Sequence, residues 1–284
     1  MAQFMTLANG YTIPIIGFGT WKATEEQNEK IITKAIDAGY RYFDTASFYG
    51  TETYVGKAIA KSEQKREDFF IASKIWKDQL GYEETKKAFA GTLKALETEY
   101  LDMYLIHWPL PTPTMPENEW KQLNIDTWRA MEELYEEGKI RAIGVSNFLP
   151  HHLNNLLENC TIKPMINQLE LHVGYMQHAT VQYCREQGVI PQAWSPIGRG
   201  KVLTQPLIVE LAKKYEVSPA KICLKYLLQQ AIMIIPKAST PERMQENLLG
   251  FETFTITQED MWRINTLPQM GWSGEHPDYE RVFI

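Results

Sequence analysis

The chain has 284 residues and a formal net charge of −6 at pH 7, and 44% of its residues are hydrophobic. This composition is typical of a globular protein with a large core, and the acidic balance argues against nucleic acid and anionic membranes as partners. The sequence shows no apolar run near the ~20 residues that span a bilayer and no N-terminal signal peptide, so we expect a cytoplasmic protein.

Short apolar runs follow one another along the chain, as expected for buried parallel strands. Their residue ranges are 15–17, 40–44, 69–74, 102–107, 140–146, 165–168, 189–194 and 232–236. Helical patterns separate them: one begins with a capping box of Thr24 and Gln27 and stops before Gly39. Two later helices are predicted to begin at Ser218-Pro219 and Thr240-Pro241. The strands recur about every 31 residues, which is the period of a βα unit.

We therefore predict an α/β protein with a closed (β/α)8 TIM barrel, built as a single domain of residues 1–284. A doubly wound sheet is the alternative, because the sequence alone does not show that the sheet closes. Three segments fall outside the repeat: a hairpin over residues 4–14 with Asn9-Gly10 at its turn, an extra helix over 205–215 after the seventh strand, and a C-terminal helix over 258–266 followed by an aromatic-rich tail.

Polar side chains stand where most of these strands end. They are Asp44, Lys74, His107, Ser146, Asn147, Gln168, Ser195 and Lys237. A solvated loop residue would explain any one of them. A barrel, however, brings all of its strand ends around one mouth, where the active sites of such barrels lie. We therefore expect the functional site at this end.

A series of motifs in chain order resembles the aldo-keto reductase family. The motifs are Gly17-Phe18-Gly19-Thr20-Trp21-Lys22, Asp44-Thr45-Ala46-Ser47-Phe48-Tyr49-Gly50, Ser73-Lys74, Ile106-His107-Trp108-Pro109, Gly144-Val145-Ser146-Asn147-Phe148, Asn167-Gln168, Ser195-Pro196 and Ile235-Pro236-Lys237. Together they span nearly the whole chain, whereas Gly17-x-Gly19 alone lacks the third glycine of a dinucleotide-binding fingerprint. The resemblance points to bacterial-type aldehyde and ketone reductases, similar to the diketogluconate reductases.

The resemblance implies a catalytic set of Asp44, Tyr49, Lys74 and His107, and the chemistry of carbonyl reduction agrees with it. No side chain donates hydride, so a nicotinamide cofactor must supply it. Tyr49 is the expected general acid in reduction and general base in the reverse oxidation. We expect Lys74 to lower the pKa of the phenol, Asp44 to keep Lys74 charged and oriented, and His107 to hydrogen-bond the substrate oxygen.

The resemblance also implies a binding site for NADPH or NADP⁺, with some use of NADH. The implied residues are Gly19, Thr20, Trp21, Asp44, Ser146, Asn147, Gln168, Trp194, Ser195, Pro196, Ile197, Gly198, Arg199, Lys201, Lys237, Ala238, Ser239, Thr240, Arg243, Glu246 and Asn247, the last two at the adenine. Among them, Ser146, Asn147 and Gln168 match positions that bind the nicotinamide carboxamide. Trp194 stands where the family stacks an aromatic ring, usually tyrosine, on the nicotinamide.

Two basic segments are expected to bind the phosphates of the cofactor. The segment 195–201 carries Arg199 and resembles the loop that folds over the pyrophosphate. Lys237 and Arg243, at the start of the last barrel helix, suit the 2′-phosphate of the adenosine. Many family members have serine where this chain has Ala238, and the missing hydroxyl is the reason for expecting some use of NADH.

Aromatic side chains beside the motifs are expected to line an apolar substrate pocket. The set is Trp21, Phe48, Tyr49, Trp76, His107, Trp108 and Trp272, the last in a tail that the family uses as a variable wall. We predict no metal site, and we expect surface positions for most of His151, His152, His172 and His178. The cysteines, whose odd number suggests reduced thiols, are interpreted as inert; they are Cys160, Cys184 and Cys223.

Two other classes of function fit a barrel. A metal-dependent hydrolase would need several strand-end ligands, and His107 is the main histidine available there. A cofactor-binding regulatory subunit, of the kind the family includes beside channels, would not need the full catalytic set, so the presence of all four residues favours an enzyme. We therefore expect a reductase of small carbonyl substrates, without nucleic acid or membrane partners, and monomeric as members of this family often are.

Overall fold

The structure is a computed structural model that describes residues 4–22 and 28–282. Within those residues, eight parallel strands form one sheet in chain order. They are β3 (Phe18–Gly19), β4 (Tyr42–Asp44), β5 (Phe70–Ile75), β6 (Met103–Ile106), β7 (Ile143–Ser146), β8 (Ile166–Glu170), β9 (Ile190–Trp194) and β10 (Met233–Ile234). The sheet closes on itself, since Gly17 N donates to Ile234 O at 2.9 Å and Ile234 N donates to Ile15 O at 3.0 Å. The predicted barrel is confirmed, and the doubly wound alternative is wrong.

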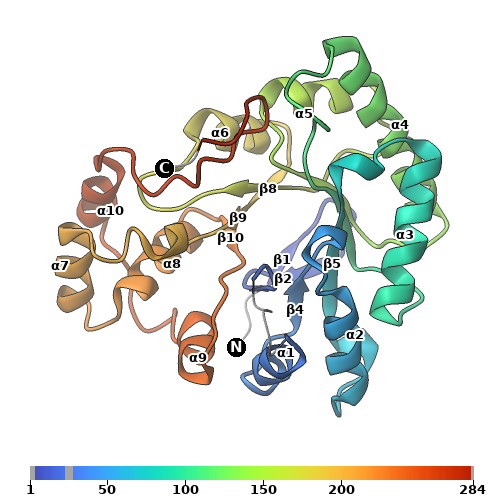
Figure 1. Ribbon diagram of the computed structural model, residues 1–284. Coiled ribbons are helices and arrows are strands. Elements are labelled where there is room, and N and C mark those ends of the chain that lie inside the picture. Colours follow the sequence, from blue (N-terminus) through green and yellow to red (C-terminus); the bar gives the residue numbers. More distant parts are fainter. Residues whose placement is uncertain (1–3, 23–27, 283–284) are drawn as a thin grey trace.

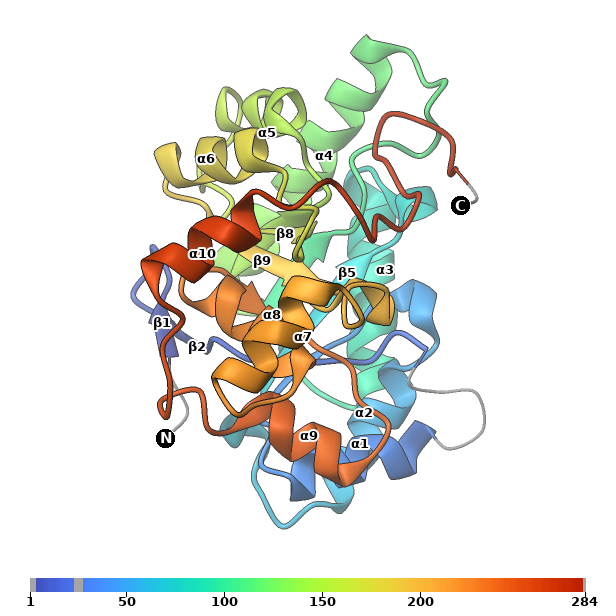
Figure 2. The same cartoon turned by 90° about the vertical axis from the view of Figure 1, so that its left-hand side faces the viewer.

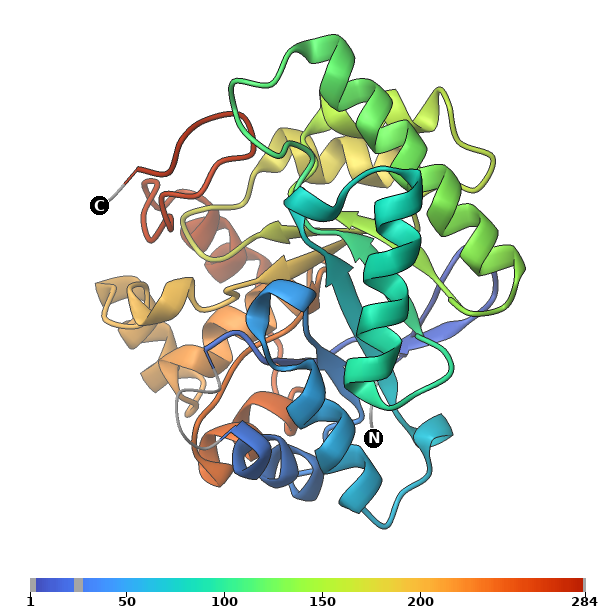
Figure 3. The same ribbon diagram turned by 45° about the vertical axis from the view of Figure 1, so that its right-hand side comes forward.

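Helices surround the barrel (Figures 1 and 3). Those of the βα repeat are α1 (Asn28–Asp37), α2 (Glu52–Lys61), α3 (Tyr82–Leu96), α4 (Glu117–Glu136), α5 (Pro150–Leu157), α6 (His178–Glu186), α8 (Pro219–Leu228) and α9 (Pro241–Leu248). The two predicted extra helices are present as α7 (Pro206–Lys214) and α10 (Gln258–Asn265). Short 3₁₀ turns occupy Ser47–Tyr49, Arg66–Asp68, Lys77–Gln79 and Gly198–Gly200. None of the helices within 4–22 and 28–282 combines the length and the apolar character that a membrane span requires.

The predicted helix starts are confirmed where the structure describes them. Ser218 accepts a hydrogen bond from Lys221 N at 3.1 Å and caps α8, while Thr240 caps α9 by accepting from the Arg243 backbone. Each is followed by proline at the first helical position. The capping box predicted at Thr24 lies outside the described residues.

The predicted hairpin is also present, and it covers the N-terminal end of the barrel. It consists of β1 (Phe4–Thr6) and β2 (Thr12–Pro14). Gly10 in its turn has a φ of +84°, a conformation that glycine adopts without steric cost. Leu7 and Ile13 are buried in one cluster with Phe70 and Met103, which begin two of the barrel strands. The hairpin therefore closes the end of the barrel opposite to the predicted site.

The barrel strands alternate between an outer face under the helices and an inner face. In β5, Ala72 belongs to the apolar cluster inside the barrel, and Lys74 comes next on the same face. Along β6, Met103 and Leu105 precede His107 in the same way. This period of two stacks an apolar floor beneath a layer of polar side chains at the C-terminal end of the sheet.

Gly56 marks a close approach of α2 to α3. A Cβ atom at this position would lie 2.4 Å from the backbone oxygen of Leu96. We expect Gly56→Ala to lower the free energy of unfolding by about 1–3 kcal/mol, as measured by urea denaturation, because the two helices must move apart. Gly91→Ala in α3 is the matched control: nothing lies within 4 Å of its added Cβ, so alanine should stabilise the helix by up to about 1 kcal/mol. Equal effects of the two substitutions would contradict the close approach.

Candidate active site

Four side chains from successive strand ends meet at the C-terminal mouth of the barrel. Asp44 ends β4 and Tyr49 lies in the 3₁₀ turn after it, while Lys74 belongs to β5 and His107 follows β6. The Nζ atom of Lys74 lies 2.5 Å from Asp44 Oδ1 and 3.4 Å from the Tyr49 hydroxyl. That hydroxyl lies 3.4 Å from His107 Nε2. The structure therefore brings together the four residues that the sequence predicts as catalytic.

Burial governs the ionisation of this cluster. It raises the pKa of Tyr49 well above the usual value of about 10, and the negative charge of Asp44 raises it further. The pKa of Tyr49 therefore lies above its usual range in the folded chain, and the separate lowering of this pKa that we expect from the Lys74 ammonium stays a prediction. Burial also lowers the pKa of Lys74, although Asp44 opposes that effect, and burial together with Lys74 lowers the pKa of His107 well below its usual range. At neutral pH, Tyr49 is a protonated phenol and His107 a neutral imidazole.

A layer of amides joins the cluster to the neighbouring strands. Gln168 in β8 donates from Nε2 to Asp44 Oδ2 at 2.7 Å. Asn147, which follows β7, donates from Nδ2 to the backbone oxygen of His107 at 2.9 Å. Its Oδ1 accepts a hydrogen bond from the indole of Trp194 at 2.9 Å. Residues predicted to bind a carboxamide and to stack on a nicotinamide thus lie beside the catalytic four.

A cleft of about 950 Å³ opens above these residues. One of its walls is aromatic: Phe48 stacks on Trp76 with ring centroids 3.8 Å apart, and Trp21 lies 4.9 Å from the ring of Tyr49. Trp76 also meets the ring of His107 edge-on at 5.0 Å. The predicted substrate residues that line the cleft are Trp21, Phe48, Tyr49, Trp76, His107 and Trp108. The Tyr49 hydroxyl therefore lies next to an apolar wall suited to hydrophobic groups.

Most of the predicted cofactor residues line the same cleft. They are Gly19, Trp21, Asp44, Ser146, Asn147, Gln168, Trp194, Ser195, Pro196, Ile197, Arg199, Lys237, Ala238, Ser239, Arg243, Glu246 and Asn247. A Cβ at Gly19 would lie 2.9 Å from the backbone oxygen of Ile235, so glycine is required for this close approach. The guanidinium of Arg199 lies 5.9 Å from the Trp194 ring, and Lys237 and Arg243 flank the start of α9. Amides beside the catalytic cluster and cations along the cleft fit a dinucleotide phosphate such as NADPH.

Some predicted site residues do not line the cleft. They are Thr20, Lys74, Gly198, Lys201, Thr240 and Trp272. Thr20 and Lys74 are buried beside Asp44, and the Thr20 hydroxyl donates to the backbone oxygen of Asp44 at 2.9 Å. Thr240 is used as a helix cap. The indole of Trp272 stacks on Tyr175 with ring centroids 6.2 Å apart instead of entering the predicted pocket.

The cleft also contains residues that were not predicted one by one, although Gly200 belongs to the predicted segment 195–201 and Glu275 and His276 belong to the tail expected as a variable wall. They are Lys22, Lys77, Leu110, Pro113, Gly200, Leu203, Ser218, Pro219, Ala220, Ile235, Glu275, His276, Pro277, Tyr279, Glu280 and Arg281. The predicted N-cap at Ser218 could have indicated that Ser218 and the residues after it lie near the cleft, because barrel helices begin at the end of the barrel that holds the active site. The tail has no periodic pattern, so the sequence does not indicate which of its side chains face the cleft.

Two of the four histidines outside the site are buried, contrary to expectation. His152 Nε2 lies 2.8 Å from a carboxylate oxygen of Asp278, and His172 Nε2 lies 3.4 Å from one of Glu170. Each ring also makes a hydrogen bond through Nδ1, with Leu149 N in His152 and with Val173 O in His172, and these bonds help to accommodate an imidazole in the interior. Burial raises the pKa of the thiols to about 11 in Cys184 and about 12 in Cys223 and also raises that of Cys160, which favours the protonated thiol, while their inertness stays a prediction.

A protonated phenol beside a buried ion pair, at the base of a cleft that suits a dinucleotide phosphate, is characteristic of a barrel oxidoreductase. The chain belongs to the aldo/keto reductase family, whose model matches residues 15–268. It is an oxidoreductase of a family that uses NADP(H) and acts on small carbonyl compounds.

Individual relatives cover nearly the whole chain. Glyoxal reductase of Bacillus subtilis (strain 168) is 42% identical over 96% of this chain and 95% of its own. The 9,11-endoperoxide prostaglandin H2 reductase of Trypanosoma cruzi (strain CL Brener) is 40% identical over 96% of this chain and 94% of its own. Among solved structures, a mutant of Gox0644 in complex with NADPH is similar with a TM-score of 0.89 and 31% identity, covering 99% of this chain and all of that one.

Proposed function

We propose that the protein reduces aldehydes and ketones to alcohols with NADPH, and that Tyr49 donates the proton. The observation that carries the proposal is the position of the Tyr49 hydroxyl, 3.4 Å from both Lys74 Nζ and His107 Nε2 at the base of the cleft. NADPH supplies hydride when it is bound. The proposal assigns the complementary steps to side chains of this chain.

Each residue of the cluster has a distinct role in the proposal. The Tyr49 phenol holds its proton at neutral pH and donates it to the carbonyl oxygen as charge develops there. Lys74 stabilises the phenolate that remains, and Asp44 fixes Lys74 through their 2.5 Å ion pair. Neutral His107 orients and polarises the carbonyl oxygen through a hydrogen bond from its imidazole.

The cofactor would lie along the cleft, with its nicotinamide beside the catalytic cluster. The proposed partners of the carboxamide are Ser146, Asn147 and Gln168, and Trp194 would stack on the ring. Arg199 would bind the pyrophosphate. We further propose that residues 1–284 act as one domain, since the family match covers residues 15–268. The monomeric state is proposed only from the resemblance to the family.

The test of the proposed function follows the absorbance of NADPH during incubation with a panel of aldehydes and ketones that includes glyoxal and benzaldehyde. We expect consumption of NADPH with at least part of the panel and loss of most of that activity in Tyr49→Phe. Tight binding of NADPH without turnover of any carbonyl would instead favour a regulatory cofactor-binding protein.

Cofactor preference is expected to depend on Arg243. Its side chain and that of Lys237 line the cleft at the start of α9, where they suit the 2′-phosphate that distinguishes NADPH from NADH. Arg243→Ala should raise the KM for NADPH about tenfold and leave the KM for NADH within about twofold, because a charge-assisted contact to the phosphate is lost. Arg129→Ala, on the exposed side of α4, is the control and should change neither value. A wild-type preference for NADH would contradict the assignment of this site.

A further inference from the structure

The C-terminal tail lines the cleft with residues on both sides of Asp278, and the part from residue 273 to residue 278 is called the strap. Figure 1 shows the red tail leaving α10 and running past β8 toward the α5 side of the barrel, and Figure 2 shows the same course from the side. Three consecutive side chains of the strap, Glu275, His276 and Pro277, line the cleft. The strap is therefore part of the wall of the cleft. The contacts that attach it to the barrel set the position of this part of the wall.

The first attachment is at the beginning of the strap. The carboxylate of Glu170, at the end of β8, is buried and accepts hydrogen bonds from Ser273 N at 3.0 Å and Ser273 Oγ at 2.7 Å. His172 Nε2 lies 3.4 Å from the same carboxylate. Because a buried carboxylate requires such partners, this contact fixes Ser273 to the barrel.

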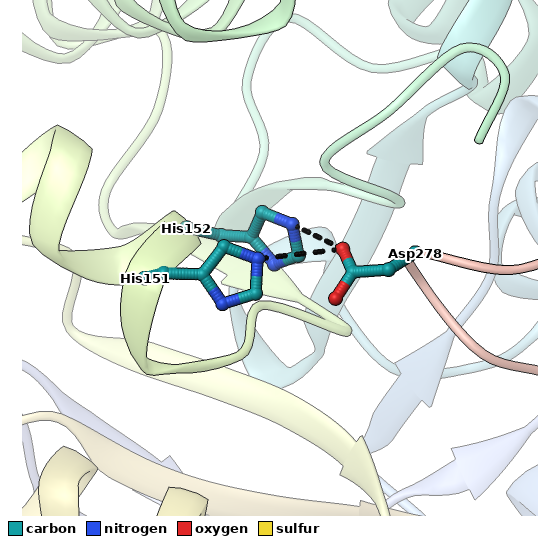
Figure 4. A group of neighbouring side chains, drawn as sticks. All are labelled: His151, His152 and Asp278. Atoms are coloured by element: carbon teal, nitrogen blue, oxygen red, sulfur yellow. Dashed lines mark ion pairs between the residues drawn. The ribbon is translucent and has the colours of Figure 1, made fainter. Parts of the chain in front are cut away.

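The second attachment is at the end of the strap. Asp278 Oδ1 lies 2.8 Å from His152 Nε2 and 3.4 Å from His151 Nε2, both in the first turn of α5 (Figure 4). The Nδ1 atom of His152 accepts a hydrogen bond from Leu149 N at 3.2 Å. Burial lowers the pKa of His152, so its ring is neutral and its one proton is on Nε2. The Nε2 proton of His152 therefore faces the Asp278 carboxylate, whose Oδ1 lies 2.8 Å away.

The same protonation state argues against a metal ion at this position. The ligand atoms of His151, His152 and Asp278 lie within 4.8 Å of one another, which is close enough for a cation. A metal ligand needs a lone pair on Nε2, whereas the contact with Leu149 leaves Nε2 of His152 protonated. We therefore interpret the cluster as a polar contact that attaches the strap to α5.

Hydrogen bonds within the tail keep the strap compact between its two attachments. Ser273 Oγ accepts from Glu275 N at 3.2 Å, and His276 Nδ1 accepts from Asp278 N at 3.1 Å. The indole of Trp272 donates to the backbone oxygen of Glu275 at 3.0 Å. These contacts join the backbone of the strap and the His276 ring to the two attached residues, Ser273 and Asp278.

We propose that His152 and Glu170 are positioning residues, which act through Asp278 and Ser273 to hold His276 as a fixed part of the substrate cleft. This inference rests on carbonyl reduction as the proposed function and specifies its substrate class. The favoured substrate is an aldehyde or ketone with a flat apolar group, which contacts both the aromatic wall and the strap. Glyoxal, with two carbons, is the short comparison substrate, and the proposal expects it not to contact the strap.

Steady-state kinetics of Asp278→Ala with benzaldehyde and glyoxal test the inference. We expect the KM for benzaldehyde to rise about fivefold to tenfold at nearly constant kcat, because the lost contact binds ground state and transition state alike. The KM for glyoxal and the Kd for NADPH should remain within about twofold of wild type. Asp278→Asn should restore the KM for benzaldehyde, because its Oδ1 still accepts from His152. An equal rise for both aldehydes, or none for benzaldehyde, would overturn the inference.

Further measurements separate the inference from its alternatives. Asp37→Ala removes an exposed carboxylate at the end of α1 and is the matched control, with all constants expected to be unchanged. Wild-type protein that reduces neither aldehyde would refute the proposed function itself, whereas active wild type with an unaffected Asp278→Ala would refute only the role of the strap. The melting temperature is also measured with and without Zn²⁺. If Zn²⁺ raises it in wild type but not in Asp278→Ala, the cluster is a metal site and the inference that it attaches the strap is wrong.

Discussion

Tyr49→Phe is expected to lower kcat for carbonyl reduction by about 10²- to 10⁴-fold, while the Kd for NADPH stays close to wild type. The substitution removes the proton donor, whose oxygen lies 3.4 Å from both Lys74 Nζ and His107 Nε2. Phenylalanine keeps the ring that packs 4.9 Å from Trp21, so the shape of the cleft is preserved. The loss should therefore appear in the chemical step and not in cofactor binding.

The measurement is the rate of NADPH consumption at saturating cofactor and carbonyl. Tyr54→Phe is the matched control, because it removes a phenol hydroxyl from an exposed position on α2 and should keep kcat within about twofold. The pH profile adds a second check: burial and Asp44 raise the pKa of Tyr49, so the donor stays protonated and kcat for wild-type reduction should be flat across neutral pH. Undiminished turnover in Tyr49→Phe would refute Tyr49 as the proton donor.

The barrel and its catalytic corner were predictable because both depend on regular periods in the sequence. A βα unit recurs about every 31 residues, and alternation along each strand carries the inward face from Ala72 to Lys74 and from Leu105 to His107. The βα repeat and the alternation of side chains along each strand therefore place Lys74 and His107, from separate strands, at the same end of the barrel. The resemblance to the family then indicated which of the polar strand ends to propose as the catalytic set.

The properties that could not be predicted depend on tertiary burial. The pKa of Tyr49 is raised because the folded chain removes the phenol from water, and no motif reports the depth of a side chain. His152 and His172 are buried because carboxylates distant in sequence, Asp278 and Glu170, accompany them. The strap is an irregular segment whose position depends on these contacts, so its role in the cleft required the structure.

The ion pair between Asp44 and Lys74 is expected to matter more for chemistry than for stability. Both side chains are buried, and Lys74 Nζ also donates to the backbone oxygen of Thr45 at 2.9 Å. Breaking a buried pair leaves one charge without its partner, so Lys74→Met and Asp44→Asn should each lower the free energy of unfolding, by an amount in the range of about 3–5 kcal/mol. Replacing both partners removes both charges, and it is often close to neutral for stability.

A double-mutant cycle by urea unfolding measures this interaction. We expect the combined variant Asp44→Asn/Lys74→Met to lose at least about 2 kcal/mol less than the sum of the two single losses. Glu52, a buried carboxylate whose charge acts on Lys74, should soften the effect of Asp44→Asn, because the ammonium keeps a second negative neighbour. Lys74→Met is therefore expected to be the more damaging of the two single substitutions.

The kinetics of the same variants separate stability from catalysis. All three should lose most of kcat for carbonyl reduction, because the phenolate formed at Tyr49 no longer has an oriented cation beside it. One outcome is that the double variant unfolds at the same urea concentration as wild type and yet does not reduce carbonyls. In that case the charges of Asp44 and Lys74 serve proton transfer at Tyr49 and not folding. If the double variant loses as much stability as the two single variants together, Asp44 and Lys74 do not interact. That result would contradict the arrangement of charges on which the proposed role of Tyr49 depends.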